Sequence, residues 1–109
     1  MPYYLVQAAY TGESWAAQVK AQLDPRQRLT ALVEALGGRL ESLYYSFGEY
    51  DVAGIAEFPS NDAAAGFSLA ASAGGATKAV KTTPLMTVEE GLNAMRKASE
   101  ASRGYQPPR

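Results

Sequence analysis

The chain of 109 residues contains no cysteine and no histidine. The absence of cysteine excludes disulfides, thiol nucleophiles, thiolate metal sites and iron–sulfur clusters. The absence of histidine removes the commonest general base, a frequent metal ligand and the proximal ligand of many haems. We therefore expect no metal site and no bound cofactor, and the lack of histidine weighs against an enzyme.

Neither sign of charge dominates, because ten Lys and Arg residues face eleven Asp and Glu residues and leave a net charge of −1. No basic face is implied, so nucleic acid is not an expected partner. No apolar run approaches the length of a membrane span, and Met1-Pro2-Tyr3 carries no basic signal-peptide region. We expect a cytoplasmic protein that does not contact a membrane.

The length fits one domain with a modest core. The end of the chain has a different composition, since Gly104, Pro107 and Pro108 cannot continue a helix. We predict a single domain over residues 1–101 and a flexible tail over residues 102–109.

Residues 40–57 predict a β-hairpin at the centre of a sheet. Two runs of apolar and aromatic residues, which suit strands, flank the pair Gly48-Glu49. Glycine at the first turn position suits a type II′ turn, because it adopts a positive φ without steric cost. The pattern therefore predicts a two-residue turn at Gly48-Glu49.

The residues before the hairpin predict a strand and a helix. Tyr3 to Tyr10 is a short apolar run of strand-forming residues. Residues 13–23 permit a helical turn that carries Trp15. Asp24 and Pro25 mark a helix start, as the N-cap and the first helical residue. This helix has an apolar stripe and ends at two glycines: Leu29, Leu32, Val33, Leu36, Gly37 and Gly38.

The residues after the hairpin predict a helix, a strand and a last helix. Ser60 or Asn61 offers an N-cap for an alanine-rich helix over residues 63–73. A strand is predicted over residues 76–86, with Pro84 at an edge position. Thr87 and Glu90 have the spacing of a capping box, which predicts the start of the last helix.

This order of elements, β-α-β-β-α-β with an added C-terminal helix, is that of a ferredoxin-like α+β domain. Its helices cover one face of the sheet, so the other face should be polar in a monomer. Here both parities of the first and third strands are apolar, as Val6 and Leu5 or Val52 and Ile55 illustrate. We expect a homodimer or larger even assembly, with sheets packed face to face as in a dimeric α/β barrel.

The motif Gly48-Glu49-Tyr50-Asp51 after a Leu-Tyr-Tyr strand resembles the GYD domain family, which is named for this element. The similarity extends to about residue 100 and includes further segments: Pro2-Tyr3-Tyr4, Tyr10-Thr11, the Leu29 helix, Gly37-Gly38, Glu57-Phe58-Pro59, Gly74-Gly75 and Lys81-Thr82-Thr83. The resemblance implies a ferredoxin-like fold assembled as a dimeric α/β barrel, and it implies no particular chemistry. Ser60-Asn61-Asp62 stands where the family often has acidic residues.

The candidate ligand-binding residues are Tyr50, Asp51, Trp15 and Tyr45. Asp51 and Tyr50 are also catalytic candidates, and burial among the neighbouring tyrosines would raise the pKa of the Asp51 carboxyl. The alternative for Asp51 is structural, with its carboxylate accepting hydrogen bonds at the turn. Trp15 is predicted to act as a lid or to plug one end of the sheet.

Two classes of function follow from these residues. The first is a binding or regulatory dimer that holds a small, largely apolar ligand in a pocket between sheet and helices. The second, by analogy of fold alone, is a cofactor-independent oxygenase or isomerase. A remote third possibility is a tautomerase that uses Pro2 as its base after removal of Met1.

Overall fold

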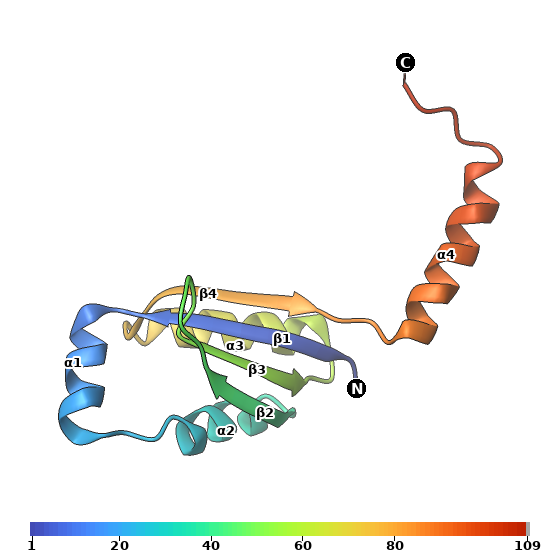
Figure 1. Ribbon diagram of the computed structural model, residues 1–109. Coiled ribbons are helices and arrows are strands. Elements are labelled where there is room, and N and C mark those ends of the chain that lie inside the picture. The colour runs from blue at the N-terminus through green and yellow to red at the C-terminus, as the bar shows by residue number, and fades with distance from the viewer. Residues whose placement is uncertain (109) are drawn as a thin grey trace.

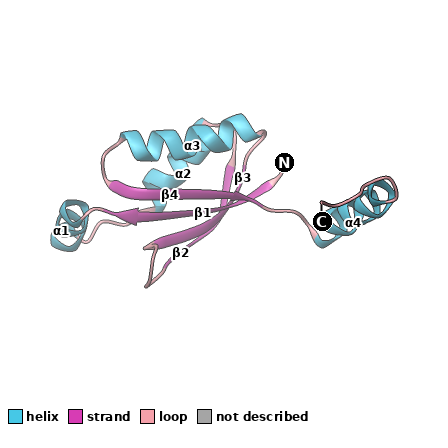
Figure 2. Cartoon of the chain, turned by 90° about the horizontal axis from the view of Figure 1, so that it is seen from above, coloured by secondary structure: helices cyan, strands magenta, loops and turns pink. Residues whose placement is uncertain are grey.

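The computed structural model describes residues 1–108. Its elements are β1 (Tyr3–Tyr10), α1 (Gly12–Ala21), α2 (Arg26–Ala35), β2 (Arg39–Tyr45), β3 (Val52–Glu57), α3 (Asn61–Ala73), β4 (Thr77–Pro84) and α4 (Val88–Ser102). The strands form one antiparallel sheet in the order β2-β3-β1-β4, and α2 and α3 lie on the same side of it (Figures 1 and 2). The predicted ferredoxin-like α+β architecture is confirmed.

One side of the sheet holds the hydrophobic core. Val6 pairs with Gly54, and Tyr4 pairs with Ala56, so the even-numbered residues of β1 and β3 share this side. They pack against α2 and α3 in one cluster of buried residues: Tyr4, Val6, Val33, Ala56, Phe58, Ala64 and Phe67. We call this side of the sheet the covered face.

The other side of the sheet has no helix against it (Figure 2). We call it the open face; it presents Leu5 from β1, Ala53 and Ile55 from β3, and Tyr44 from β2. Leu5, Ala53 and Ile55 are half-buried, and Tyr44 is 69% exposed. An ion pair between Arg39 and Glu57 stands at one end of this face. Both faces of the central strands therefore carry apolar side chains.

Helix α2 begins one residue later than predicted. Arg26 is its first residue, and Pro25 rather than Asp24 takes the N-cap position. Asp24 still satisfies a free donor of the first turn, because its Oδ1 accepts the Arg26 backbone N–H at 2.9 Å. At the other end Gly37 has φ = +80°, which suits glycine and ends the helix.

The predicted two-residue turn at Gly48-Glu49 is wrong. Strands β2 and β3 separate after the pair Tyr45–Val52, and residues 46–51 form a longer loop. Gly48 does not have a positive φ, as a type II′ turn would require. The Asp51 backbone N–H donates to the Ala8 carbonyl of β1 at 2.8 Å, which ties the end of the loop to the central strands. The loop is closed at its base by Ser46, whose N–H and hydroxyl reach the carbonyls of Asp51 and Tyr50.

The two remaining helices lie at opposite ends of the sheet (Figures 1 and 2). Thr11 caps α1, which is a full helix rather than the single turn that was predicted. The predicted capping box of α4 is confirmed, since Thr87 and Glu90 bond to each other's backbone N–H. None of the residues of α4 is buried, and the helix projects away from the sheet. No helix of the described residues is long and apolar enough to cross a membrane.

Candidate ligand-binding site

A cavity of about 200 Å³ lies on the covered face, between β1, β3 and the two helices α2 and α3. Its walls are mainly apolar, and the large side chains among them are Leu29, Leu32, Leu43, Val52 and Phe67. The space exists because α3 and its C-cap present Ala70, Ala71 and Gly74 here, and β1 presents Ala8. Side chains this small do not fill the space between α3 and the sheet. A hollow therefore lies between the sheet and the helices, and ligand binding in it stays a prediction.

Arg28 is the charged residue among those that line this cavity. Its Nη2 donates to the Tyr10 hydroxyl at 3.2 Å and to Gln18 Oε1 at 3.4 Å. The guanidinium carbon also lies 5.9 Å from the centroid of the Tyr10 ring. Gln18 and Tyr10 are both buried, and Gln18 donates in turn to the Ser14 hydroxyl at 3.1 Å. Arg28 is thus oriented by side chains from two neighbouring elements, α1 and β1.

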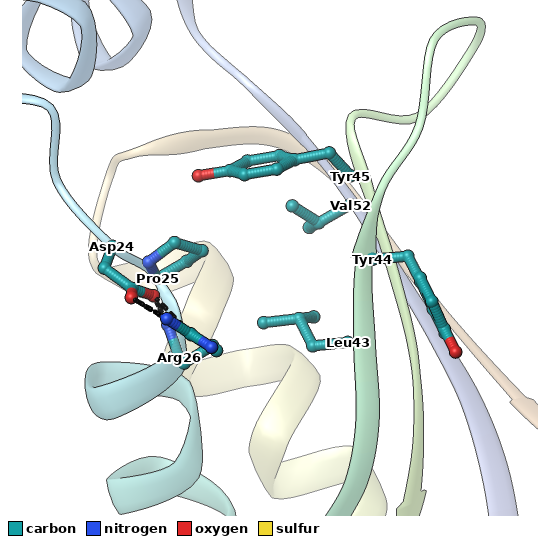
Figure 3. A pocket seen from close by; sticks show the side chains of 7 residues that line it. All are labelled: Asp24, Pro25, Arg26, Leu43, Tyr44, Tyr45 and Val52. Atoms are coloured by element: carbon teal, nitrogen blue, oxygen red, sulfur yellow. Dashed lines mark hydrogen bonds and ion pairs between the residues drawn. The ribbon is translucent and has the colours of Figure 1, made fainter.

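A second hollow adjoins the cavity between the start of α2 and strand β2. Figure 3 shows Leu43, Tyr45 and Val52 pointing toward Asp24 and Arg26, whereas Tyr44 points to the other side of β2. The two hollows share Leu43 and Val52. Hydrogen bonds from Arg26 lower the pKa of Asp24 from 3.8 to about 2, and Asp24 raises the pKa of Arg26. This exposed ion pair, at 2.6 Å, forms the polar rim of the second hollow.

Three of the four predicted ligand-binding residues meet at the β2–β3 loop. Trp15, Tyr45 and Asp51 line one shallow hollow there, together with Ser46, Phe47 and Gly48. Trp15 packs edge-on against Tyr10, with ring centroids 5.3 Å apart, and lies 6.4 Å from Tyr45. Tyr50 is not among the residues that line this hollow, although it is adjacent in sequence to Asp51. Trp15 therefore lies against one end of the sheet.

Asp51 joins three parts of the chain. Its Oδ2 accepts the Tyr10 backbone N–H at 2.8 Å and the Trp15 indole N–H at 3.2 Å. The first bond extends the pairing of β1 and β3 beyond the last backbone pair, Ala8 and Val52. The second holds α1 against the end of the sheet. These contacts are those of the structural alternative, in which the carboxylate accepts hydrogen bonds from the chain around it.

None of the four predicted residues lines the cavity on the covered face. The sequence reasoning missed Arg28, Tyr10 and the small residues of α3. Arg28 could have been identified by its place in the sequence. It lies next to Leu29 and one turn before Leu32, on the helix whose apolar stripe faces the sheet. The spacing between two helices is a tertiary property, so the full set of residues that line the cavity could not be identified from local patterns in the sequence.

Pro2 lies at the exposed start of β1, where its carbonyl accepts the Phe58 backbone N–H at 3.2 Å. Among the described residues, no group of three acidic side chains is placed to hold a metal ion. Pro2 is also not among the residues that line the cavity.

The model of one protein family, the GYD domain, matches residues 4–95. The chain belongs to the GYD domain family. The matched region of this GYD domain begins in β1 and ends within α4, so it contains all of the sheet except Tyr3, both covering helices and the cavity. No curated protein matches the chain, and no solved structure does.

Proposed function

We propose that this GYD domain is a dimeric binding protein that holds a small, largely apolar ligand in the cavity on its covered face. The observation that carries the proposal is the cavity itself, with its apolar walls and volume of about 200 Å³. A dry apolar cavity of about 150 Å³ is known to bind benzene. The cavity therefore suits a molecule with one ring or a short acyl chain. Such a molecule is smaller than a drug-sized ligand.

Binding is favoured over catalysis by the groups that line the cavity. Its ionisable side chains are those of Arg28 and Tyr10. An arginine does not give up its proton at neutral pH, and the Tyr10 oxygen already accepts a hydrogen bond from it. The lining therefore offers orientation and apolar contact rather than a proton acceptor.

The dimer is supported by apolar surface that the chain itself leaves uncovered. Leu5, Ala53 and Ile55 lie together on the open face. Helix α4 carries a second apolar strip, Val88, Leu92 and Met95, in which each residue is at least 45% exposed. The radius of gyration is 17.6 Å, whereas a compact domain of this length has about 13 Å. A second copy packed on the open face, within reach of α4, would cover both surfaces.

Ligand binding is tested by nuclear magnetic resonance titration with toluene, a one-ring apolar probe. We expect amide shifts concentrated in residues around the cavity, such as Leu32 and Val52. Ala71→Leu should abolish them by filling the cavity, because Ala71 lies in its wall. The matched control is Ala73→Leu, an exposed position of the same helix outside the cavity lining. Shifts that survive Ala71→Leu would contradict the proposed site.

A further inference from the structure

We infer that the ligand of this cavity is a small carboxylic acid, bound with its apolar part in the cavity and its carboxylate on Arg28. The inference rests on the proposed function and adds the chemical class of the ligand. It starts from the arrangement of charge, because an apolar cavity with a single cation at its rim selects for a molecule with one anionic end.

Arg28 has donors to spare. A guanidinium carries five N–H donors, and only those of Nη2 have acceptors, in Tyr10 and Gln18. Among residues 1–108, neither Nε nor Nη1 of Arg28 has a hydrogen-bond partner, and no carboxylate lies within ion-pair distance of it. The Gln18 contact is long, at 3.4 Å, so a stronger acceptor can replace it. The planar group is therefore able to take a carboxylate through two nitrogens.

The position of Arg28 is set by neutral neighbours rather than by a competing anion. Tyr10 is 5% exposed and Gln18 is 6% exposed, so the two groups that hold the guanidinium are themselves fixed in the core. Asp24 is close enough to sense the charge of Arg28, but its oxygens are already bound by Arg26. Little rearrangement is needed to bring a ligand carboxylate to Arg28.

A carboxylate fits these donors better than a phosphate does. A phosphate has three terminal oxygens and more charge, which usually require several cations or backbone N–H groups. Here one guanidinium borders walls made of leucine, valine, phenylalanine and alanine. A planar carboxylate on a single ring or a short acyl chain uses both parts of the site.

The test compares benzoate with benzamide, its neutral counterpart of the same shape, and with toluene, in titrations followed by amide shifts. We expect benzoate to bind about threefold more tightly than benzamide, because Arg28 is exposed and water weakens its ion pair with the carboxylate. In Arg28→Gln this preference should disappear while toluene still binds, and Arg28→Lys should retain part of it. The control for a lost positive charge is Lys20→Gln, at an exposed position of α1 outside the cavity lining, which should keep the preference.

Three results would overturn the inference, and they separate it from the proposed function. If toluene binds and benzoate binds no better than benzamide, the cavity is a binding site but the carboxylate assignment is wrong. If the benzoate preference persists in Arg28→Gln, another group binds the anion. If none of the three probes shifts cavity residues, the proposed function fails as well. Should Arg28→Gln not fold, raising the salt concentration in the wild-type protein must reduce the affinity for benzoate and not that for benzamide.

Discussion

The two faces of the sheet carry similar apolar side chains but differ in how far these side chains are buried. On the covered face Val6 and Ala56 are buried beneath α2 and α3, with 6% and 0% exposure. On the open face their sequence neighbours Leu5 and Ile55 are only half-buried, although they are at least as large and as apolar. The difference lies in what is packed on each face and not in the strands. An apolar strand residue thus favours a cover on its face, and in our proposal the second copy supplies the cover of the open face.

Helices α2 and α4 repeat this contrast. Both have an apolar stripe, but Val33 of α2 is fully buried, whereas no residue of α4 is buried. The apolar stripe of α2 is buried against the sheet of the same chain. The stripe of α4 is exposed in the single chain, and in our proposal the second copy covers it.

The largest expected effect comes from breaking the covered face. In Gly38→Ala the new methyl group would run into the Glu57 carbonyl oxygen and press on Phe58 and Val33. We expect a loss of about 3 kcal/mol in the free energy of unfolding, measured by urea denaturation at fixed protein concentration. Gly48→Ala is the control, because nothing lies within 4 Å of its added methyl group. It should change the free energy of unfolding by less than about 0.5 kcal/mol, and a large loss there would restore the tight-turn assignment.

The open face is broken by Ile55→Asp. A carboxylate in the middle of an apolar interface is costly to bury, so the dimer dissociation constant should rise at least tenfold, about 1.4 kcal/mol or more. Sedimentation velocity over a dilution series measures this constant. Val19→Asp places the same charge on α1, where Val19 is already 70% exposed, and should leave the constant unchanged. An unaltered dimer in Ile55→Asp would show that the open face is not the interface.

Asp51→Asn tests whether Asp51, a predicted site residue at the end of the sheet, has a structural role or a binding role. The substitution weakens the bonds from Tyr10 and Trp15, and we expect a loss of about 1–3 kcal/mol in the free energy of unfolding. The fluorescence of Trp15, the single tryptophan, should change as well. Glu49→Gln removes a charge from an exposed position of the same loop and should have little effect. Unchanged stability in Asp51→Asn would make a binding role for this residue the better explanation.

The stripe of α4 is tested by Leu92→Glu. If α4 packs on the second copy, this change should raise the dimer dissociation constant by about tenfold, equivalent to about 1.4 kcal/mol. Ala94→Glu introduces the same side chain on another side of the helix and should have no such effect. Equal behaviour of the two variants in sedimentation velocity would mean that the stripe faces solvent in the dimer.

The smallest effect is expected from the exposed pair of Asp24 and Arg26 beside the cavity. The folded-state pKa of Asp24 is lowered from 3.8 to about 2 by the hydrogen bonds of Arg26. Any stabilisation from this group is therefore complete above pH 3.8 and is lost as the pH falls through about 2. Carboxyl carbon resonances should show Asp24 still ionised at pH 3, and Arg26→Gln should move its midpoint toward 3.8. A midpoint that Arg26→Gln does not alter would contradict the pairing, whose contribution to stability is small because both partners are exposed.

The order of elements was predictable because it depends on local patterns. The boundaries of β1, the N-cap Ser60 and the capping box at Thr87 all depend on residues a few positions apart. The loop at Gly48 was mispredicted because contacts beyond the Gly48-Glu49 pair hold it, both from Ser46 within the hairpin and from β1. Asp51 bonds to Ala8 and Tyr10, which are about forty residues away in sequence.

The candidate site was only partly predictable for the same reason. The structure places Trp15, Tyr45 and Asp51, but not Tyr50, at one hollow, and a binding role for these four residues stays a prediction. The cavity depends instead on where small residues of α3 meet the sheet, and Arg28 reaches it across α1 and β1. Such tertiary contacts between distant segments produce no periodic pattern in the sequence.

Sedimentation equilibrium of the unmodified chain at micromolar concentration tests most directly whether the two faces differ as proposed, one covered by its own helices and the other by a second copy. The account predicts a species of about twice the chain mass of 11.6 kDa. A single species of 11.6 kDa at these concentrations would contradict it.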